Sequence, residues 1–373
     1  MKVVIFHKSL NPMAGAERVC LAVIEALKEL NYEVTLVTME PTNWSHVCKF
    51  NSEIVKPDEE ISILKIPIKL LSIYLKFYAY HMFGRLRRKF DLSINTHGDS
   101  LPVSADIVFM NSPVNFKSKT LPEKCYESLL WKVYYQPYLF LQSIFPTKFE
   151  WKLLLASSEF TRDSIKKNLN SEVIILYPPV DINEFSKASF NNHRLNQVVL
   201  CGRYSPEKNY EFALEVAKHL PYIEFIIIGS VSDKTYYNKI ARLTKEYYLK
   251  NVKLLINVSR KTQIDIYSKS KVFMHTAVNE PFGIAVVEGM AAGLVPVVHR
   301  SGGPWLDIIK QGEYGLGFRD VNEAIEFTYN AIKNYSSLKH KVIERAKAYS
   351  KQNFIKHFKS LIQMINLSSK RAM

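Results

Sequence analysis

The sequence has few cysteines and no long uncharged apolar run. Its four cysteines lie far apart without the paired spacing of a zinc site, so neither a disulfide framework nor structural zinc is predicted, and a reducing compartment is expected. The most apolar tract, residues 61–89, is interrupted by Lys65, Lys69 and Lys76 and falls short of the roughly 18 uncharged residues of a spanning helix. The first residues lack the apolar core of a signal peptide. We therefore expect a cytoplasmic protein that does not cross a membrane.

Acidic residues are also scarce relative to basic ones. Fifty Lys and Arg against 35 Asp and Glu give a formal charge of +15, which favours an anionic partner such as a nucleic acid, a nucleotide substrate or a membrane surface. Repetitive or Gly/Ser/Pro-rich tracts are absent, and 47% hydrophobic residues indicate a folded globular protein. A length of 373 residues suits two domains.

The order of apolar patterns predicts two α/β halves. In the first half, residues 2–6 and 32–38 have the pattern of strands on either side of a helix over 16–30. A strand at 197–202 opens a second series in which strands and helices alternate. Between them, residues 186–196 follow two adjacent prolines and are polar, which predicts an irregular linker.

These patterns predict three parts of the chain. We expect an acceptor-side domain over residues 1–185, a second domain over 196–350 and a C-terminal helix over 351–373. Phe354 and Phe358 begin an apolar face on that helix, which we expect to cross back to the first domain.

Residues 279–309 carry several glycines and two glutamates eight positions apart. A helix is predicted from Gly283 to Gly293, and the free N–H groups at its start make an anion site. Glu280 precedes this helix, and Glu288 lies over a turn into it, where a carboxylate can accept hydrogen bonds from two ribose hydroxyls. The alternative is that Glu280 is an ordinary charge at a helix N-terminus and Glu288 a solvated surface residue.

The segment 201–209, CGRYSPEKN, follows the first strand of the second half. Its Arg203 and Lys208 provide positive charge where strand ends and helix starts meet. Alone, each would be an ordinary surface residue on so basic a chain. Together with the two glutamates, they predict a site for a nucleotide diphosphate.

Three segments carry a family resemblance: GRYSPEKN, NEPFGIAVVEGMAAGLVPVV and SGGPWLDII. In this order and near these spacings they resemble family 4 of the glycosyltransferases, and PMAGAERV and LYPPVDINEF extend the likeness over most of the chain. The resemblance implies an α/β fold of the GT-B class, with two Rossmann-like domains facing an inter-domain cleft. The amino-acid sequence of residues 279–309 is most similar to that of the mannosyltransferases that extend dolichol-linked oligosaccharide.

The family resemblance also implies an activity. It is a retaining transfer of a sugar, mannose from GDP-mannose, to a polyprenyl- or dolichol-linked saccharide, with no metal or other cofactor. A UDP-sugar donor and a surface polysaccharide or glycolipid product remain open. The expected partners are the nucleotide sugar, the lipid-linked saccharide and an anionic membrane surface. A nucleic-acid-binding protein is the disfavoured alternative, because the two halves lack an RNA-type aromatic motif.

The resemblance assigns roles in the second half. Arg203 and Lys208 would hold the donor diphosphate and neutralise the leaving nucleotide. Glu280 would act at the donor sugar, and Glu288 would hold the ribose. The backbone amides expected to contact sugar or phosphate are those of Phe282, Gly283 and Ile284.

The first half supplies the acceptor side. Gly15 stands where the family often has two glycines, the other being Ala14 here, and would allow close approach of a substrate. Where family members commonly have a histidine before a proline, this chain has Asn111, which can hydrogen-bond a sugar hydroxyl but cannot act as an acid or base. His97, after a preceding strand, is the alternative candidate for that role. The alternative for His97 is that it is simply a polar histidine in a loop.

Two basic and aromatic tracts, residues 61–89 and 126–152, suit the surface of an anionic membrane. The alternative is that both are core helices with basic outer faces. A lipid-linked acceptor would explain why the protein needs a membrane-binding surface. We therefore expect a protein bound peripherally to the cytosolic face of a membrane.

Overall fold

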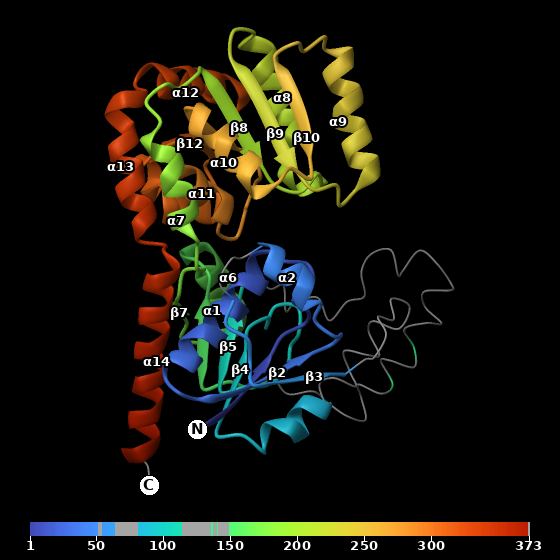
Figure 1. Ribbon diagram of the computed structural model, residues 1–373, viewed down its shortest axis with the longest axis vertical. Helices are drawn as coiled ribbons and strands as arrows, with labels where there is room; N and C mark the ends of the chain where they lie inside the picture. Colours follow the sequence, from blue (N-terminus) through green and yellow to red (C-terminus); the bar gives the residue numbers. More distant parts are fainter. Residues whose placement is uncertain (51–53, 64–80, 114–135, 137–139, 141–148, 372–373) are drawn as a thin grey trace. The chain divides into compact units, whose positions relative to one another are not determined.

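The computed structural model describes residues 1–50, 54–63, 81–113, 136, 140 and 149–371, and the chain divides into two compact units. Each unit has its own sheet of parallel strands with helices beside it (Figure 1). Unit 1 comprises Met1–Ser157, Thr161–Pro178 and Phe354–Met373. Unit 2 comprises Ser158–Phe160 and Pro179–Asn353.

Unit 1 is built on parallel strands in the order β3-β2-β1-β4-β5-β6-β7. These strands are β1 (Lys2–Phe6), β2 (Glu33–Thr38), β3 (Glu59–Ser62), β4 (Leu92–Asn95), β5 (Ile107–Met110), β6 (Leu153–Ala156) and β7 (Ile174–Ile175). The named helices with all or most of their residues in this unit are α1 (Gly15–Glu29), α2 (Trp44–Phe50), α6 (Glu159–Leu169) and α14 (Lys351–Arg371), and residues 81–87 are also helical.

The core of unit 1 joins the first strand to the last helix. Residues 3–6 of β1 are fully buried, as expected for a parallel strand covered on both faces. The apolar face predicted near the C-terminus, with Phe354, Phe358 and Ile362, lies in the same buried cluster as Val19 of α1. Helix α14 therefore packs its apolar face on the core of the N-terminal sheet.

Unit 2 is built on parallel strands in the order β10-β9-β8-β11-β12-β13. These strands are β8 (Gln197–Cys201), β9 (Glu224–Gly229), β10 (Val252–Ile256), β11 (Val272–His275), β12 (Val295–His299) and β13 (Leu316–Phe318). Its longer helices are α7 (Ile182–Ser186), α8 (Tyr210–His219), α9 (Lys234–Glu246), α10 (Arg260–Lys269), α11 (Ile284–Ala291), α12 (Val321–Lys333) and α13 (Tyr335–Lys347). Short helical turns are η1 (Lys187–Phe190), η2 (Pro206–Lys208), η3 (Pro304–Ile308) and η4 (Lys310–Gly312).

The strand order of each sheet reverses near its centre. Strand β1 lies between β2 and β4, and strand β8 lies between β9 and β11. In open α/β sheets, ligands bind beyond the carboxyl ends of the strands at such a reversal. We call residues 7–14 and 96–99, which follow β1 and β4, the unit 1 switch point. Residues 202–209 and 276–283, which follow β8 and β11, are the unit 2 switch point.

The predicted irregular linker is wrong in one respect. Residues 182–190 are helical, as α7 and η1, and the two units divide between Pro178 and Pro179. The side chain of Phe185 is fully buried, with its ring 5.4 Å from that of Tyr267. Phe185 thus anchors α7 just before the predicted linker, and the helical residues of that linker are 186–190.

Candidate functional site

The unit 2 switch point carries a buried ion pair. Lys208 ends the turn η2 after β8, and its Nζ lies 2.6 Å from Oε2 of Glu280, in the loop after β11. Both side chains are largely buried. Two residues predicted from separate segments of the sequence are thus brought together where the strand order reverses.

Glu280 is held ionised by its neighbours. Burial disfavours its charged form, but the nearby imidazole of His275 and the charge of Lys208 lower the pKa of Glu280 well below its usual range. His275 is the last residue of β11, and its Nε2 lies 3.5 Å from Glu280 Oε2. The sequence analysis missed His275, although its place at the end of a strand was a usable signal.

Arg203 lies apart from this pair. Its side chain is 58% exposed and contacts Glu207 Oε1 at 3.3 Å. An exposed guanidinium in the loop after β8 is free to move toward an anion, whereas Lys208 is fixed in place by Glu280. The side chains of the two predicted phosphate-binding residues therefore differ in how well they are ordered before a ligand binds.

The N-terminus of α11 has the geometry predicted for an anion site. Gly283 precedes the helix with φ of 99°, a conformation that favours glycine, and Gly293 follows it with φ of 85°. The amides that open a helix, such as that of Ile284, have no carbonyl partner within it, whereas the Val286 amide already donates to the Gly283 carbonyl at 3.0 Å. The ring of Phe282 is buried against that of Tyr349, 5.4 Å away, so Phe282 offers a ligand only its backbone.

Two further glycines hold the loop that carries Glu280. A Cβ on Gly302 would lie 2.3 Å from the backbone O of Glu280, and a Cβ on Gly303 would lie 2.4 Å from that of Pro281. The Gly303 amide donates to the Glu280 carbonyl at 2.9 Å. The glycines of SGGPW therefore allow two loops to pack backbone to backbone beside α11.

Glu288 is buried rather than solvated, which makes the predicted alternative of a surface residue wrong. Its side chain is 5% exposed, and Arg260 Nη1 lies 3.4 Å from its Oε1. Arg260 also lies 3.4 Å from Glu184 and over the ring of Phe185. Sequence analysis missed Arg260, although it opens a helix soon after strand β10.

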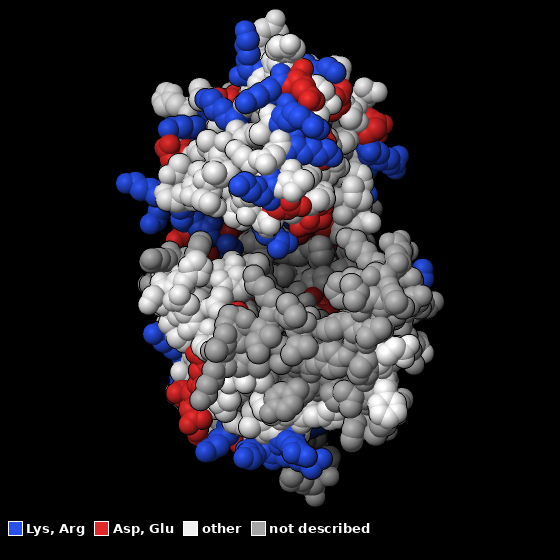
Figure 2. Space-filling view, turned by 90° about the vertical axis from the view of Figure 1, so that its right-hand side faces the viewer, with Lys and Arg blue, Asp and Glu red and all other residues white. Residues whose placement is uncertain are grey.

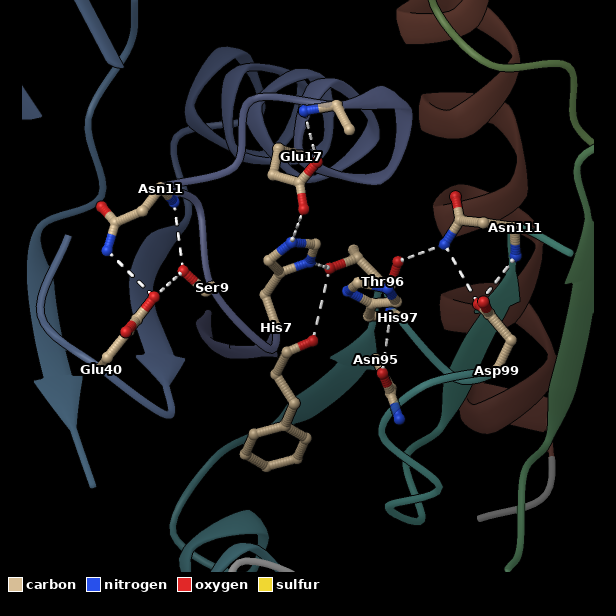
Figure 3. A network of polar contacts seen from close by, with 12 residues as sticks. His7, Ser9, Asn11, Glu17, Glu40, Asn95, Thr96, His97, Asp99 and Asn111 are labelled. Carbon is tan, nitrogen blue, oxygen red and sulfur yellow. Dashed lines mark hydrogen bonds and ion pairs between the residues drawn. The ribbon is translucent and has the colours of Figure 1, made fainter. Parts of the chain in front are cut away.

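At the unit 1 switch point, His7 and His97 lie side by side. His7 follows β1 and His97 lies two residues beyond β4, with their ring centroids 4.9 Å apart. Figure 3 shows His7 between Glu17 of α1 and Thr96. His7 Nε2 lies 3.7 Å from Glu17 Oε1, and Glu17 Oε2 accepts the Ala14 amide at 2.7 Å.

The two histidines have opposite pKa shifts. Burial disfavours charged His7, but the neighbouring Cys20 and Glu17 outweigh burial and raise the pKa of His7 to about 9. For His97, burial and the charge of His7 act together and lower the pKa to about 4. His97 is therefore a neutral base near pH 7.

Gly15 and Asn111 have structural roles in the backbone around them. Gly15 is the first residue of α1, after the N-cap Ala14. Asn111 Nδ2 donates to the Thr96 carbonyl at 3.0 Å, and the Asn111 amide donates to Asp99 at 3.1 Å (Figure 3). Asn111 thus fixes the loop that carries His97.

Comparisons with known proteins bear on the unit 2 site. Residues 181–349 match a family model described as "Glycosyl transferases group 1". A relative from Dictyostelium discoideum, named GDP-Man:Man(3)GlcNAc(2)-PP-Dol alpha-1,2-mannosyltransferase, is 28% identical over 243 residues, which are 58% of this chain and 48% of that protein. The Homo sapiens protein of the same name is 30% identical over 151 residues, 36% of this chain and 31% of that one. The matches thus span about half or less of these relatives.

Solved structures resemble both units. Sucrose-phosphate synthase from Thermosynechococcus elongatus gives a TM-score of 0.73 at 16% identity, over 99% of this chain and 100% of that one. Anabaena HepE in complex with UDP and glucose gives a TM-score of 0.67 at 14% identity, over 97% and 99%. The family resemblance predicted from the sequence, including its likeness to the dolichol-linked α-1,2-mannosyltransferase, is confirmed. Residues 181–349 therefore match the glycosyl transferases group 1, in a chain with the α/β two-sheet fold of the GT-B glycosyltransferases.

Proposed function

We propose that this chain is a retaining glycosyltransferase that moves mannose from GDP-mannose to a polyprenyl- or dolichol-linked saccharide. The observation that carries the proposal is the Lys208–Glu280 pair at the unit 2 switch point, beside the glycine-capped start of α11. A fixed cation, a fixed carboxylate and unpaired helix amides are the groups that a nucleotide diphosphate and its sugar require.

In this proposal Lys208 acts on the leaving group. As the bond between sugar and diphosphate breaks, negative charge grows on the diphosphate, and an ammonium already in place stabilises that charge without reorganisation. The diphosphate competes with Glu280 for Lys208, which is 2.6 Å from the carboxylate in the ligand-free chain. Arg203, exposed in the same loop, adds a second cation when it turns inward.

Glu280 and Glu288 take different ends of the donor. Glu280 is held ionised beside His275 and lies just before α11, where it can accept hydrogen bonds from hydroxyls of the sugar. Glu288 lies within α11 and is aligned by Arg260, with a carboxylate suited to the ribose diol. The amides of Phe282, Gly283 and Ile284 complete the phosphate contacts. No metal is needed for the donor in this proposal, because fixed cations take its place.

The names of the relatives support a lipid-linked acceptor and GDP-mannose as donor. HepE, whose fold is similar, was crystallised with UDP, so a UDP-sugar remains the alternative donor. We place the acceptor with unit 1, because its switch point carries the polar set around His97 and Asn111.

We further propose that the protein binds a membrane peripherally. No helix among the described residues is long and apolar enough to span a bilayer. Arg85, Arg88 and Lys89 are exposed, whereas Arg87 donates to Asp106 at 2.9 Å and belongs to the fold of unit 1. Residues 64–80 and most of 126–148 lie outside the described residues. Figure 2 shows Lys and Arg scattered among acidic side chains on the visible face, rather than in the stripe expected of a nucleic-acid-binding protein.

The test is transfer from radiolabelled donors to a polyprenyl diphosphate saccharide, with GDP-mannose and UDP-glucose compared. We expect turnover with GDP-mannose that is lost in Lys208→Ala and kept in Lys218→Ala, an exposed lysine of α8. Turnover with UDP-glucose alone would replace the donor but keep the reaction. Absence of transfer from every nucleotide sugar would contradict the proposal.

A further inference from the structure

The His7–Glu17–His97 cluster contains polar atoms that are buried without hydrogen-bond partners. His7 is fully buried, and its Nε2 has no hydrogen-bond partner, nor has Nδ1 of His97. Leaving a buried polar atom unpaired costs roughly 1–3 kcal/mol, so two in one place require an explanation. The three residues of the cluster come from separate places in the chain: just after β1, the first turn of α1 and the loop after β4.

The hydrogen bonds of Thr96 decide which nitrogen of His7 carries a proton. The Thr96 hydroxyl donates to the Phe6 carbonyl at 3.3 Å, so its oxygen accepts from His7 Nδ1, 2.9 Å away. A neutral His7 therefore directs the lone pair of Nε2 at the Glu17 carboxylate. Two electron-rich groups that face each other in a buried site require a positive charge between them.

The separation of His7 and Glu17 indicates what that charge is. Nitrogen–oxygen hydrogen bonds are about 2.7–3.2 Å long, and Nε2 to Oε1 is 3.7 Å. Two ligands about 2.0–2.2 Å from one zinc ion lie roughly 3.3 Å apart at a tetrahedral angle and up to about 4.2 Å apart when opposite. The observed distance is thus long for a shared proton and fits two ligands of one ion.

His97 supplies the third ligand. One ligand atom from each of His7, Glu17 and His97 can be chosen so that all lie within 4.8 Å of one another. Coordination of one ion would require the widest pair to close by about 1 Å. We propose that these three residues bind one divalent transition-metal ion, and that zinc suits their two imidazoles and one carboxylate best.

The surroundings resemble those of bound metals elsewhere. A histidine ligand commonly donates its second N–H to an oxygen, as His7 Nδ1 does to Thr96. The second carboxylate oxygen of Glu17, Oε2, accepts a hydrogen bond from the Ala14 amide at 2.7 Å, which fixes the orientation of the side chain. Three protein ligands leave a position for water or another oxygen ligand. The ion would tie β1, α1 and the loop after β4 together, independently of the proposed sugar transfer. The proposed metal ion departs from our expectation of no metal, which concerned the binding of the donor.

Metal binding is tested on the full chain, purified without a polyhistidine tag and stripped with EDTA. Equilibrium dialysis against Zn²⁺ followed by mass spectrometry of the metal measures the stoichiometry and affinity. We expect one zinc per chain, bound at least tenfold more weakly in His97→Ala and in Glu17→Gln. Glu17→Gln keeps the side-chain oxygen that caps α1, and His219→Ala, an exposed histidine of α8, serves as the control.

Three outcomes would overturn the proposal, two in zinc binding and one in the cobalt spectrum. If wild type shows no saturable zinc binding, or if His97→Ala binds zinc as wild type does, the charge between His7 and Glu17 is a proton. Wild type loaded with Co²⁺ provides a second measurement that needs no variant. Intense visible absorption indicates the four- or five-coordinate ion that we expect, and the weak spectrum of a six-coordinate aquo ion contradicts it.

Discussion

The two switch points of this chain occupy the same position in their sheets and differ in their charged groups. At unit 2, Lys208 and Glu280 form an ion pair of 2.6 Å next to the start of α11. At unit 1, His7 and His97 lie together above Thr96, with Glu17 opposite His7. Strand order therefore determines where a ligand can bind, and the residues in two short loops determine what it is.

The difference matches the chemistry proposed for each unit. An ammonium held in an ion pair suits a diphosphate, whose charge rises during the reaction. A neutral imidazole such as His97 suits hydroxyls or a metal ion, and the charge of His7 helps to keep His97 neutral.

The largest effect is expected from the cation at unit 2. Lys208→Ala should lower kcat by roughly 10²–10³-fold, because removal of one fixed electrostatic contact costs about 2.7–4 kcal/mol at the transition state. Steady-state kinetics with GDP-mannose measures this. His97→Ala at unit 1 should change the KM for the acceptor more than that for the donor. A kcat in Lys208→Ala within twofold of wild type would remove Lys208 from the mechanism.

The backbone of the Glu280 loop should tolerate no side chain at Gly302. Gly302→Ala adds a Cβ 2.3 Å from the Glu280 backbone at φ of 67°, and it should destabilise unit 2 by roughly 2–4 kcal/mol. Gly84→Ala in unit 1 is the matched control, because Gly84 is helical with nothing within 4 Å of an added Cβ. Urea unfolding should show that variant unchanged or slightly stabilised. Equal midpoints for the two variants would refute the close packing of the loops.

The two glutamates of unit 2 should separate binding from chemistry. Glu288→Gln should weaken GDP-mannose binding about tenfold, because a hydrogen bond to a charged group contributes roughly 1.5–3 kcal/mol. Glu280→Gln should lower kcat more than affinity. Isothermal titration and single-turnover rates measure the two effects, with Glu215→Gln on α8 as the control. If both variants behave like that control, neither carboxylate contacts the donor.

Unit 1 should have its own response to acid through Asp106. Burial raises the pKa of Asp106, but bonds from Ser93 and charges of Lys152 and Arg87 outweigh burial and lower it to about 2. A lowered pKa stabilises the fold above the unfolded value of about 3.9, and this contribution is lost as pH falls toward 2. Asp106→Asn should cost on the order of 1–2 kcal/mol at pH 7 and less at pH 3. Urea unfolding at both pH values measures this, with the exposed Asp163→Asn as the control. A cost independent of pH would show that the charge of Asp106 is not what matters.

Much of the fold followed from local pattern, and less of the site did. The strands at 2–6 and 197–202, and the helix between Gly283 and Gly293, were predicted because burial on both faces and glycine caps leave strong signals. Arg260 was missed because its partner Glu184 lies far away along the chain. His275 was missed although Glu280 lies only five positions further on, because the strand and helix patterns do not show how the loop after β11 turns. Local sequence patterns do not reveal such side-chain contacts.

The most direct measurement is hydrogen exchange of the full chain with and without GDP at saturation, with saturation verified by titration. The account predicts slower exchange in peptides that cover residues 202–209 and 276–285, because the diphosphate binds the amides at the start of α11 and orders the loop after β8. Peptides that cover residues 7–17 and 96–99 should exchange as in the free protein. Protection at the unit 1 switch point in place of unit 2, or none at the unit 2 switch point at saturating GDP, would contradict the assignment of the donor to the Lys208–Glu280 site.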